Sequence, residues 1–352
     1  MGGRRRAPQS GPCRALTRLY ARFGHPTRFA VSWSTMRAYL IWNPMAGQRD
    51  VRNALEEAVE VLEAAGWSIR LFETVHPGDG THLARAAVAE GADVALAAGG
   101  DGTVNEVVNG LVGTDVALGV LPVGTGNTWA KELGYPAWVP PYRRPLREAA
   151  QGLIESSVRN VDVGRANGRY FLLWAGVGFD AQVAHEVESL LEMKRRLGLI
   201  LYAVSGLSLA LSFVGTRSTV VIDGRPFRGR VLMVAISNAQ LYGGGLFRLA
   251  PAAYIDDGRL DVFVFRGQGT AETFHHFFRL LTQYHMRDPS MNYYRARTVE
   301  IYTDRPMAVQ VDGEPYGQTP LTTEVVPGAL KILVPRSAPA TIFQAPMAAY
   351  AR

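Results

Sequence analysis

Short apolar runs alternate with segments of helical periodicity through the first half of the chain. The first helical segment ends at Gly66, a residue typical of helix C-termini, and carries apolar residues at helical spacing: Val51, Leu55, Val59 and Leu62. We expect strands at 39–42, 68–72, 94–98 and 117–121, and helices from 51, at 80–90 and at 103–111. This order predicts an α/β domain with a parallel sheet in a three-layer arrangement. Right-handed crossovers would bring the strand ends, and any ligand, to one edge of that sheet.

The pattern changes after the four prolines between Pro136 and Pro145. Beyond about 158, short strands separated by Asp-Gly turns dominate, which is typical of antiparallel hairpins. These strands are expected at 170–173, 219–222, 231–236, 260–265, 307–311 and 330–334. We therefore predict an α/β domain over 36–157 and a β-rich antiparallel domain over 158–336. Residues 1–35 are expected to be a disordered basic extension, and 337–352 a poorly structured tail.

Positive charge is concentrated at the start of the chain. The formal net charge is +6, and the first 37 residues hold eight arginines and no acidic residue. This segment is either a solvated tail upstream of a true start at Met36 or a contact with anionic lipid, where each basic side chain adds about 1 kcal/mol. The single cysteine, Cys13, excludes an internal disulfide and a cysteine-based metal site. No apolar segment of a secretory signal follows the arginines, so we expect a cytoplasmic protein.

One long uncharged segment bears on membrane contact. Residues 197–214 carry no charge over 18 positions, which is the lower limit for a membrane-spanning helix. However, Ser205, Ser208 and Ser212 form a small polar stripe at helical spacing. We therefore expect a buried or membrane-touching helix of the folded domain rather than a membrane span.

The most informative motif is the glycine-rich segment from Gly99 to Thr103, which follows an apolar strand and opens a helix. Glycines let backbone N–H groups approach phosphate oxygens closely, and a helix N-terminus favours the same anion. Asp101 would repel a phosphate unless a divalent cation lies between them. A tight strand-to-helix turn with an N-capping Asp is the simpler alternative for this loop taken alone.

Two further small-residue loops follow expected strands, one at 43–47 and one at 122–127. The three loops should converge on one crevice at the edge of a parallel sheet. None matches the P-loop pattern or the dinucleotide-binding pattern of glycines. A nucleotide site at this edge must therefore be built in another way.

Seven segments in this order resemble the diacylglycerol kinase catalytic domain family, which includes bacterial diacylglycerol kinases, sphingosine kinases and ceramide kinases. They are Asn43-Pro44 with Gly47, the run 99–110, the run 124–127, Asp162-Val163-Gly164, the run 175–180, the run 257–261 and Asp312-Gly313-Glu314. The resemblance extends from about Met36 to Pro335. It implies a fold like that of NAD kinases and phosphofructokinases, which share the Gly-Gly-Asp-Gly loop.

The resemblance also implies site residues. ATP would be held by Asn43, Thr74, Gly99, Gly100, Asp101, Gly102, Thr103, Val104, Asn105, Gly124, Thr125, Gly126 and Asn127. Glu314 would be the general base, since an acceptor alcohol must lose its proton as the phosphoryl group arrives. Asp101 would hold the Mg²⁺ bound to ATP, with Asp162 in the same network. A structural Mg²⁺ would be bound by Asp257 with the backbone carbonyls of Tyr254 and Arg259. An ordinary Asp-Gly turn at Asp257 remains an alternative.

Two positions depart from the family pattern. Ala46 replaces the usual Ser of the first loop, which removes one hydroxyl that could contact phosphate. Thr128 stands where bacterial diacylglycerol kinases usually carry Asp, and sphingosine kinases also lack an acid there. The acceptor lipid, diacylglycerol or a sphingoid type, is therefore left open.

The resemblance predicts a lipid kinase that transfers the γ-phosphoryl group of ATP to a hydroxyl of a membrane lipid. Its expected partners are the lipid substrate and the inner face of the membrane, with no nucleic acid, and a homodimer is left open. Two alternatives remain: a kinase of the NAD kinase type with a soluble substrate, and a lipid-binding homologue without turnover.

Overall fold

The computed structural model describes residues 35–47, 51–135, 145–188 and 199–344. The predicted N-terminal extension, with Cys13 and most of the early arginines, lies outside these residues, as do positions 197 and 198 of the uncharged segment.

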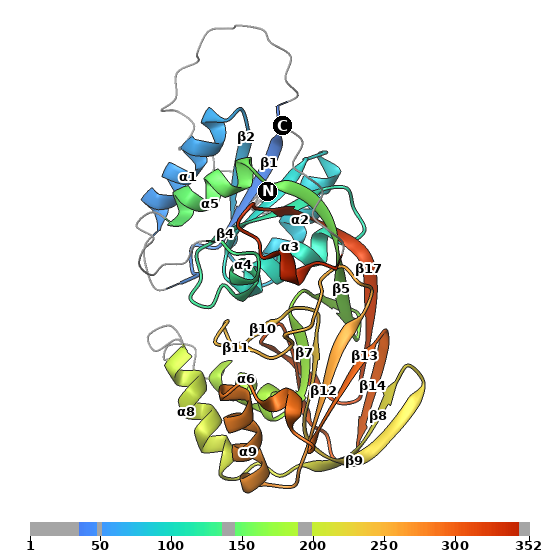
Figure 1. Ribbon diagram of the computed structural model, residues 1–352. Helices are drawn as coiled ribbons and strands as arrows, with labels where there is room; N and C mark the ends of the chain where they lie inside the picture. The colour runs from blue at the N-terminus through green and yellow to red at the C-terminus, as the bar shows by residue number, and fades with distance from the viewer. Residues whose placement is uncertain (1–34, 48–50, 136–144, 189–198, 345–352) are drawn as a thin grey trace, which may run out of the picture. The chain divides into compact units, whose positions relative to one another are not determined.

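The first half of the described chain is an alternating α/β unit (Figure 1). Its elements are β1 (Arg37–Trp42), α1 (Arg52–Ala64), β2 (Ser68–Glu73), α2 (Asp79–Ala89), β3 (Val94–Gly99), α3 (Asp101–Leu111), β4 (Ala117–Pro122), α4 (Thr128–Glu132) and α5 (Pro145–Ile154). Strands β2, β1, β3 and β4 pair in parallel in that order. Every residue of β3 and β4 is buried, which explains their continuous apolar sequence. The predicted parallel sheet is confirmed.

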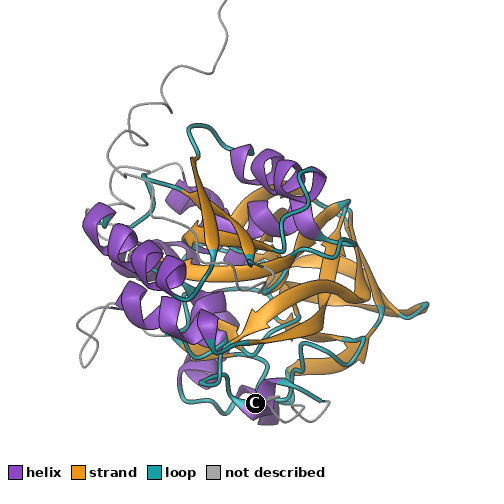
Figure 2. Cartoon of the chain, turned by 90° about the horizontal axis from the view of Figure 1, so that it is seen from above, coloured by secondary structure: helices purple, strands orange, loops and turns teal. Residues whose placement is uncertain are grey.

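The remaining elements are mainly antiparallel strands. They are β5 (Ser157–Ala166), β6 (Arg169–Phe171), β7 (Trp174–Gly178), α6 (Phe179–Glu188), α8 (Leu199–Ala210), β8 (Thr216–Ile222), β9 (Arg225–Ser237), β10 (Leu241–Tyr242), β11 (Phe247–Arg248), β12 (Leu260–Arg266), α9 (Thr270–Leu281), the 3-10 turn His285–Arg287, β13 (Met291–Ala296), β14 (Thr298–Thr303), β15 (Ala308–Val311), β16 (Glu314–Gln318), β17 (Leu321–Val334) and the 3-10 turn Ala340–Ile342. This confirms the predicted β-rich antiparallel part. The hairpin of β8 and β9 reaches beyond its neighbours (Figures 1 and 2).

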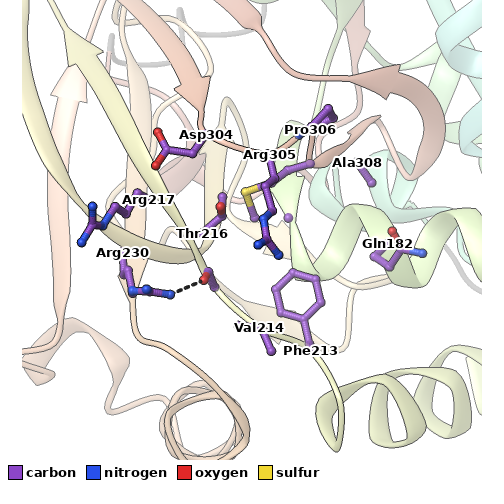
Figure 3. A pocket seen from close by; sticks show the side chains of 13 residues that line it. Gln182, Phe213, Val214, Thr216, Arg217, Arg230, Asp304, Arg305, Pro306 and Ala308 are labelled. Atoms are coloured by element: carbon purple, nitrogen blue, oxygen red, sulfur yellow. Dashed lines mark hydrogen bonds between the residues drawn. The ribbon is translucent and has the colours of Figure 1, made fainter.

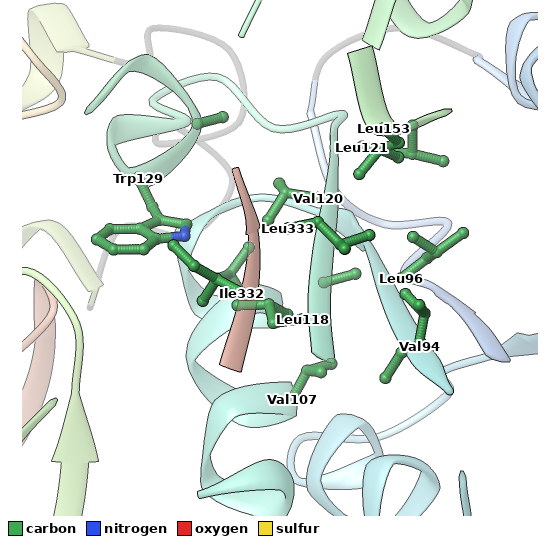
Figure 4. Packing of buried hydrophobic residues seen from close by; sticks show 14 of the residues in the cluster. Val94, Leu96, Val107, Leu118, Val120, Leu121, Trp129, Leu153, Ile332 and Leu333 are labelled. Carbon is green, nitrogen blue, oxygen red and sulfur yellow. The ribbon is translucent and has the colours of Figure 1, made fainter. Parts of the chain in front are cut away.

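Strand β17 joins the two groups of strands. It pairs antiparallel with β14 and β5 and then parallel with β4, at Ile332 opposite Leu118. Ile332 and Leu333 pack among side chains of the parallel sheet and of α3 and α4 (Figure 4). The long mixed sheet therefore runs from β16 to β2 without a break. The division predicted at 157/158 stays a prediction, because β17 contributes to the core on both sides of it.

Helices cover the parallel strands in two pairs. Helix α1 packs against α5, and α2 packs against α3 (Figure 1). The apolar stripe of α1 is buried through Leu55, Ala58 and Leu62, as its helical spacing predicts. The pairing leaves the carboxyl ends of β1, β3 and β4 and the loops that follow them at one edge.

The end of the described chain corrects one expectation. Ala338, Ile342 and Phe343 are buried in the core of the α/β part, so residues 337–344 are not a poorly structured tail. The Ile255 N–H donates to the Ile342 carbonyl at 2.9 Å, and the Arg159 guanidinium lies over the Phe343 ring. These contacts are long-range and could not be inferred from the segment's own sequence.

Helix α8 covers the described part of the uncharged segment. Among the residues that the structure describes, no helix is long and apolar enough to cross a membrane. Ser205 and Ala210 of α8 are buried, while Leu207 and the following Leu211 and Val214 are exposed. The helix therefore presents one apolar side outward.

Candidate active site

The three small-residue loops meet at the carboxyl edge of the parallel strands. The Val123 N–H donates to the Gly99 carbonyl at 3.0 Å, which joins the second loop to the third. A Cβ on Gly124 would lie 2.5 Å from the Gly100 Cα, and one on Gly47 would overlap the Val123 carbonyl oxygen. Only glycine permits backbones to pass this closely. The structure thus brings together the loops that the sequence placed at one edge.

Asn43 and Thr103 fasten the first loop to the second. The Asn43 amide donates to the Thr103 hydroxyl at 3.1 Å, and its carbonyl oxygen accepts the Met45 N–H at 2.9 Å. The Thr103 side chain lies where a Cβ on Gly99 would be, which explains why that position is glycine. Both residues therefore hold the loops in place.

The Asp101 carboxylate caps helix α4. It accepts the N–H groups of Thr128 and Trp129 at 2.9 and 3.0 Å and the Thr128 hydroxyl at 3.1 Å. An acid at the N-terminus of a helix is stabilised by the exposed N–H groups there. Asp101 therefore links the second loop to the third, and Thr128 supplies a hydrogen-bond donor where an Asp would place a second negative charge.

The third loop carries an oxygen without a partner. Asn127 has a left-handed backbone, with φ of 48°, and its amide donates to the Gly124 carbonyl at 2.6 Å. Its side-chain oxygen is buried and accepts no hydrogen bond from the residues that the structure describes. A buried unpaired acceptor is costly, so this atom fits a donor from a ligand or from water bound to a cation. Thr125 is exposed at the tip of the same loop.

Lys131 ties a glycine-rich hairpin to this loop. Its ammonium donates to the Gly244 carbonyl at 2.8 Å, in the turn between β10 and β11. Burial lowers the pKa of Lys131, while the nearby Asp101 charge acts in the opposite direction. A cation close to the loops of an anion site increases the attraction for phosphate, and sequence reasoning missed this lysine.

Glu314 lies against the second loop. One of its carboxylate oxygens, Oε1, occupies the place that a Cβ on Gly102 would take. The other, Oε2, forms an ion pair with Arg169, whose guanidinium also donates to the Asn105 side-chain oxygen at 2.8 and 3.1 Å. The carboxylate is 39% exposed, so it remains open to a ligand. The structure therefore places Glu314 beside the glycine loop, 212 positions earlier in the sequence.

The turn that precedes Glu314 is held in place by hydrogen bonds to the Asp312 carboxylate. Asp312 and Gly313 both have positive φ, at 49° and 83°. The Asp312 carboxylate accepts three consecutive N–H groups, from Leu172, Leu173 and Trp174, and the Asn105 amide at 2.8 Å. Burial raises the pKa of Asp312 to about 6, although these donors favour the charged form.

A second chain of hydrogen bonds reaches the same turn. Gln310 accepts the Gly313 N–H at 2.8 Å and donates to Asp180 at 2.9 Å, and Tyr242 donates to Asp180 at 2.8 Å. Burial raises the pKa of Asp180. Arg169 and Gln310 were missed in the sequence because their contacts join distant segments. Asp180 is the last residue of the motif at 175–180, but nothing in the sequence assigns it a role in the site.

The remaining residues predicted to bind the nucleotide differ in which of their atoms could contact it. Thr74 is buried and follows β2, and its N–H donates to the Trp42 carbonyl at 2.8 Å. The Val104 side chain is buried in the core, so only its backbone could face a ligand. The Asn105 side chain is occupied by Asp312, Tyr170, Asn109 and Arg169. Asn105 therefore positions Glu314 and Asp312 rather than offering free atoms.

Two acids predicted to bind metal lie together elsewhere: Asp162, expected in the Mg²⁺ network of Asp101, and Asp257, expected to bind a structural Mg²⁺. Asp162 accepts the N–H groups of Gly258 and Gly328 at 2.5 and 2.7 Å, and burial raises its pKa. It therefore lies at the Asp257 turn, and no hydrogen bond among the described residues joins its side chain to the phosphate loops. Asp257 accepts the Arg259 N–H at 2.9 Å and pairs with Arg295.

The Asp257 turn already has a positive partner. The Asp257 side chain is 1% exposed, and the Arg295 guanidinium supplies the charge that a cation would bring. No cluster of three or more metal-binding side chains occurs within the described ranges. These residues fit an ion pair better than Mg²⁺, and the metal assignment of Asp257, Tyr254 and Arg259 stays a prediction.

Comparisons with known proteins agree with this site. Residues 37–166 match the diacylglycerol kinase catalytic domain, and 174–334 match the YegS C-terminal NAD kinase beta sandwich-like domain. The chain is 33% identical over 288 residues to the diacylglycerol kinase of Bacillus subtilis (strain 168), covering 81% of this chain and 91% of that protein. It is 31% identical to the diacylglycerol kinase of Staphylococcus aureus (strain MRSA252), covering 81% of this chain and 88% of that protein.

The fold has solved relatives as well. A crystal structure from Bacillus anthracis str. Sterne, proposed to be a diacylglycerol kinase, superimposes with a TM-score of 0.72 at 27% identity. It covers 88% of this chain and all of that chain. The resemblance noted in the sequence is thus confirmed over nearly the whole described chain, and the protein belongs to the diacylglycerol kinase family.

Proposed function

We propose that this protein transfers the γ-phosphoryl group of ATP to a hydroxyl of a membrane lipid, and that the lipid is diacylglycerol. The observation that carries the proposal is the Glu314 carboxylate lying against Gly102 of the glycine-rich loop. A base and an anion-binding loop in contact are what an alcohol-phosphorylating enzyme needs. The names of the relatives support diacylglycerol over a sphingoid acceptor.

In this proposal the three loops bind the nucleotide. The glycines of the second and third loops expose backbone N–H groups, and the N-terminus of α3 adds partial positive charge. Lys131 contributes a further cation beside Asp101. Mg²⁺ bound with the nucleotide would neutralise phosphate charge, and Asp101 and the unpaired Asn127 oxygen are the groups that fit it or its bound water.

Glu314 would accept the proton of the lipid hydroxyl. Arg169 holds one carboxylate oxygen, which leaves Oε1 beside Gly102 to face the hydroxyl. Asp312, Asn105 and Gln310 fix the turn, so the base keeps one position relative to the loop. Such pre-organisation lowers the cost of bringing base, acceptor and phosphate together.

A lipid substrate requires contact with a membrane, and helices α8 and α9 offer the surface. They lie side by side, and the Thr270 hydroxyl donates to the Leu211 carbonyl at 3.1 Å (Figure 1). Their exposed apolar side chains are Leu207, Leu211, Val214, Phe277, Phe278 and Leu281. We propose that this face rests on the inner side of the membrane.

The test is a kinase assay on the purified full chain with ATP, Mg²⁺ and separate acceptors: diacylglycerol, sphingosine, ceramide and NAD. Labelled phosphatidate should form, and more of it in mixed micelles or vesicles than in buffer. Labelled NADP instead would favour the soluble-substrate kinase. ATP binding by calorimetry without any product would support the lipid-binding homologue and refute transfer.

A further inference from the structure

A basic cavity lies in the β-rich part, away from the glycine loops. It has a volume of about 470 Å³ and is lined by residues from the end of the α8–β8 connection, from β8 and β9, from α6 and from the turn before β15 (Figure 3). Ala308, at one end of β15, lines it, whereas Glu314 follows the other end of that strand. The cavity is therefore distinct from the proposed transfer site.

Three arginines line this cavity: Arg217, Arg230 and Arg305. Arg217 and Arg230 are direct partners across the antiparallel pair of β8 and β9. Like charges in such positions repel and destabilise a sheet. In Figure 3, Arg305 extends toward Phe213 from the opposite wall. Three exposed positive side chains, from β8, from β9 and from the turn before β15, thus line one cavity.

Asp304 is the one acidic residue among the lining residues, against three arginines. None of the three forms an ion pair with any residue in the described part of the chain, and Arg230 donates only to the Gly215 carbonyl at 3.3 Å. The Asp304 backbone N–H donates to the Arg217 carbonyl at 3.0 Å. The cavity therefore carries a net positive charge that an anion would neutralise.

The rest of the wall is apolar and continues to the proposed membrane face. Phe213, Val214, Pro306 and Met307 line the cavity beside the arginines. Val214 is 64% exposed, and Leu211, three residues earlier, is 65% exposed. A ligand with a charged head and an apolar body matches this arrangement, since Arg binds phosphate through a bidentate fork.

We propose that this cavity binds the phosphate group of an anionic phospholipid, with Arg217, Arg230 and Arg305 as its ligands and Phe213 and Val214 against the adjoining glycerol and acyl carbons. The site is an accessory one: it would anchor the chain on anionic lipid whether or not ATP is present. Its chemistry, a phosphate ester, is shared with free phosphate, so the experiment must separate the two.

The test measures binding of the full chain, without nucleotide, to phosphatidylcholine vesicles with and without phosphatidylglycerol. The double variant R230Q/R305Q should bind the anionic vesicles roughly tenfold or more weakly, because each basic side chain near an anionic surface adds about a factor of five. R225Q is the control. It removes an exposed arginine of β9 that does not line the cavity, and it should weaken vesicle binding by less than about threefold.

Two further experiments distinguish a specific phosphate site from non-specific attraction between the basic protein surface and an anionic membrane. R230K/R305K keeps the charge but loses the fork, so it should bind several-fold more weakly than the wild type. A short-chain, monomeric phosphatidylglycerol should shift the arginine side-chain N–H resonances of the wild type, and inorganic phosphate at the same concentration should not.

Three results would overturn the proposal. The first is equal binding of anionic vesicles by the wild type and R230Q/R305Q. The second is full retention of binding by R230K/R305K, which would show attraction by charge alone. The third is an equal response to inorganic phosphate, which would assign the cavity to free phosphate. Since ATP is absent throughout, none of these results depends on the transfer reaction.

Discussion

Two Asp-Gly turns of the β-rich part share a sequence but differ in what their carboxylates contact. At Asp312-Gly313 the carboxylate points inward, accepts backbone N–H groups from the β6–β7 segment and an amide from α3, and leaves the next residue, Glu314, at the glycine loop. At Asp257-Gly258 the carboxylate pairs with Arg295 and with its own turn. The same dipeptide thus holds the carboxylate that follows it against the glycine loop in one place and closes an ion pair in the other. What the neighbours supply, not the motif, decides the role.

The largest expected effect comes from replacing Glu314, the proposed base. E314Q keeps the shape of the side chain but cannot accept a proton, so kcat for lipid phosphorylation should fall by about 10²- to 10⁴-fold. ATP affinity measured by calorimetry should stay within about twofold. E324Q is the matched control, because Glu324 also pairs with an arginine on a strand, but no contact among the described residues joins its side chain to the loops. Full activity of E314Q would remove Glu314 from this role.

The contact between Gly102 and Glu314 can also be disturbed by changing the glycine. In G102A the added methyl would overlap the Glu314 carboxylate, so the base must move, and we expect kcat/KM to fall by about 10²-fold. G152A in α5 adds a methyl at ordinary contact distance, 3.6 Å from Pro335, and should leave activity unchanged. Wild-type activity in G102A would show that Glu314 does not act at this loop.

The buried Asp312 should give its turn a pH dependence. Its pKa of about 6 in the folded chain exceeds the unfolded value of 3.8, so the folded state binds its proton more tightly. This contribution to the free energy of unfolding is fully present below about pH 4 and is lost as pH rises through about 6. Relative to D312N, the wild type should therefore lose at most about 3 kcal/mol between about pH 4 and pH 7 in urea denaturation.

A control for that measurement is D223N, at a third and exposed Asp-Gly turn whose carboxylate accepts the Arg297 and Thr298 N–H groups. D223N removes a carboxylate that is exposed to solvent, so the effect of burial on the pKa is absent from this variant. If the difference between wild type and D312N is independent of pH, Asp312 does not titrate in this range.

The smallest effect is expected at the other turn. D257N removes the charge opposite Arg295 and should lower the free energy of unfolding by about 2 kcal/mol, while kcat changes by less than about twofold. The D223N variant again serves as a control, since among the described residues no arginine side chain pairs with the Asp223 carboxylate. A large loss of activity in D257N would erase the contrast between the two turns.

Mg²⁺ provides a second readout at Asp257. A rise in Tm with Mg²⁺ in the wild type that disappears in D257N would favour the predicted structural metal over the ion pair alone. An equal response of both proteins would favour the ion pair.

The α/β part could be predicted from local sequence because its signals are local. Strands β3 and β4 are continuous apolar runs, and each leads into a glycine-containing turn, with Gly99 and Gly100 at the end of β3 and Gly124 shortly after β4. Helix α5 was not predicted because its first residue, Pro145, closes a proline-rich stretch, although proline is well suited to the first turn of a helix. The loops of the site were found for the same reason as the strands they follow.

The β-rich part was predicted only in fragments because distant pairing decides it. Only 330–334 of β17 was expected, since Pro327 and Gly328 interrupt the pattern where the pairing with β5 shifts register. Strand β5 itself was missed, because most of its length pairs with β17, more than 150 residues away, and only its last residues pair with the neighbouring β6. Arg169 follows an Asn-Gly turn that indicates a hairpin, but nothing in the sequence shows that it reaches Glu314.

The course of β17 limits how the molecule can be divided. An expression fragment that stopped near 157 would lack the strand that lies beside β4, and would leave that apolar strand with an open flank able to recruit other chains. A fragment beginning near 158 would carry the missing strand with its apolar end uncovered. Neither piece should be produced as a well-behaved monomer, whereas co-expression of the two could restore the complete sheet.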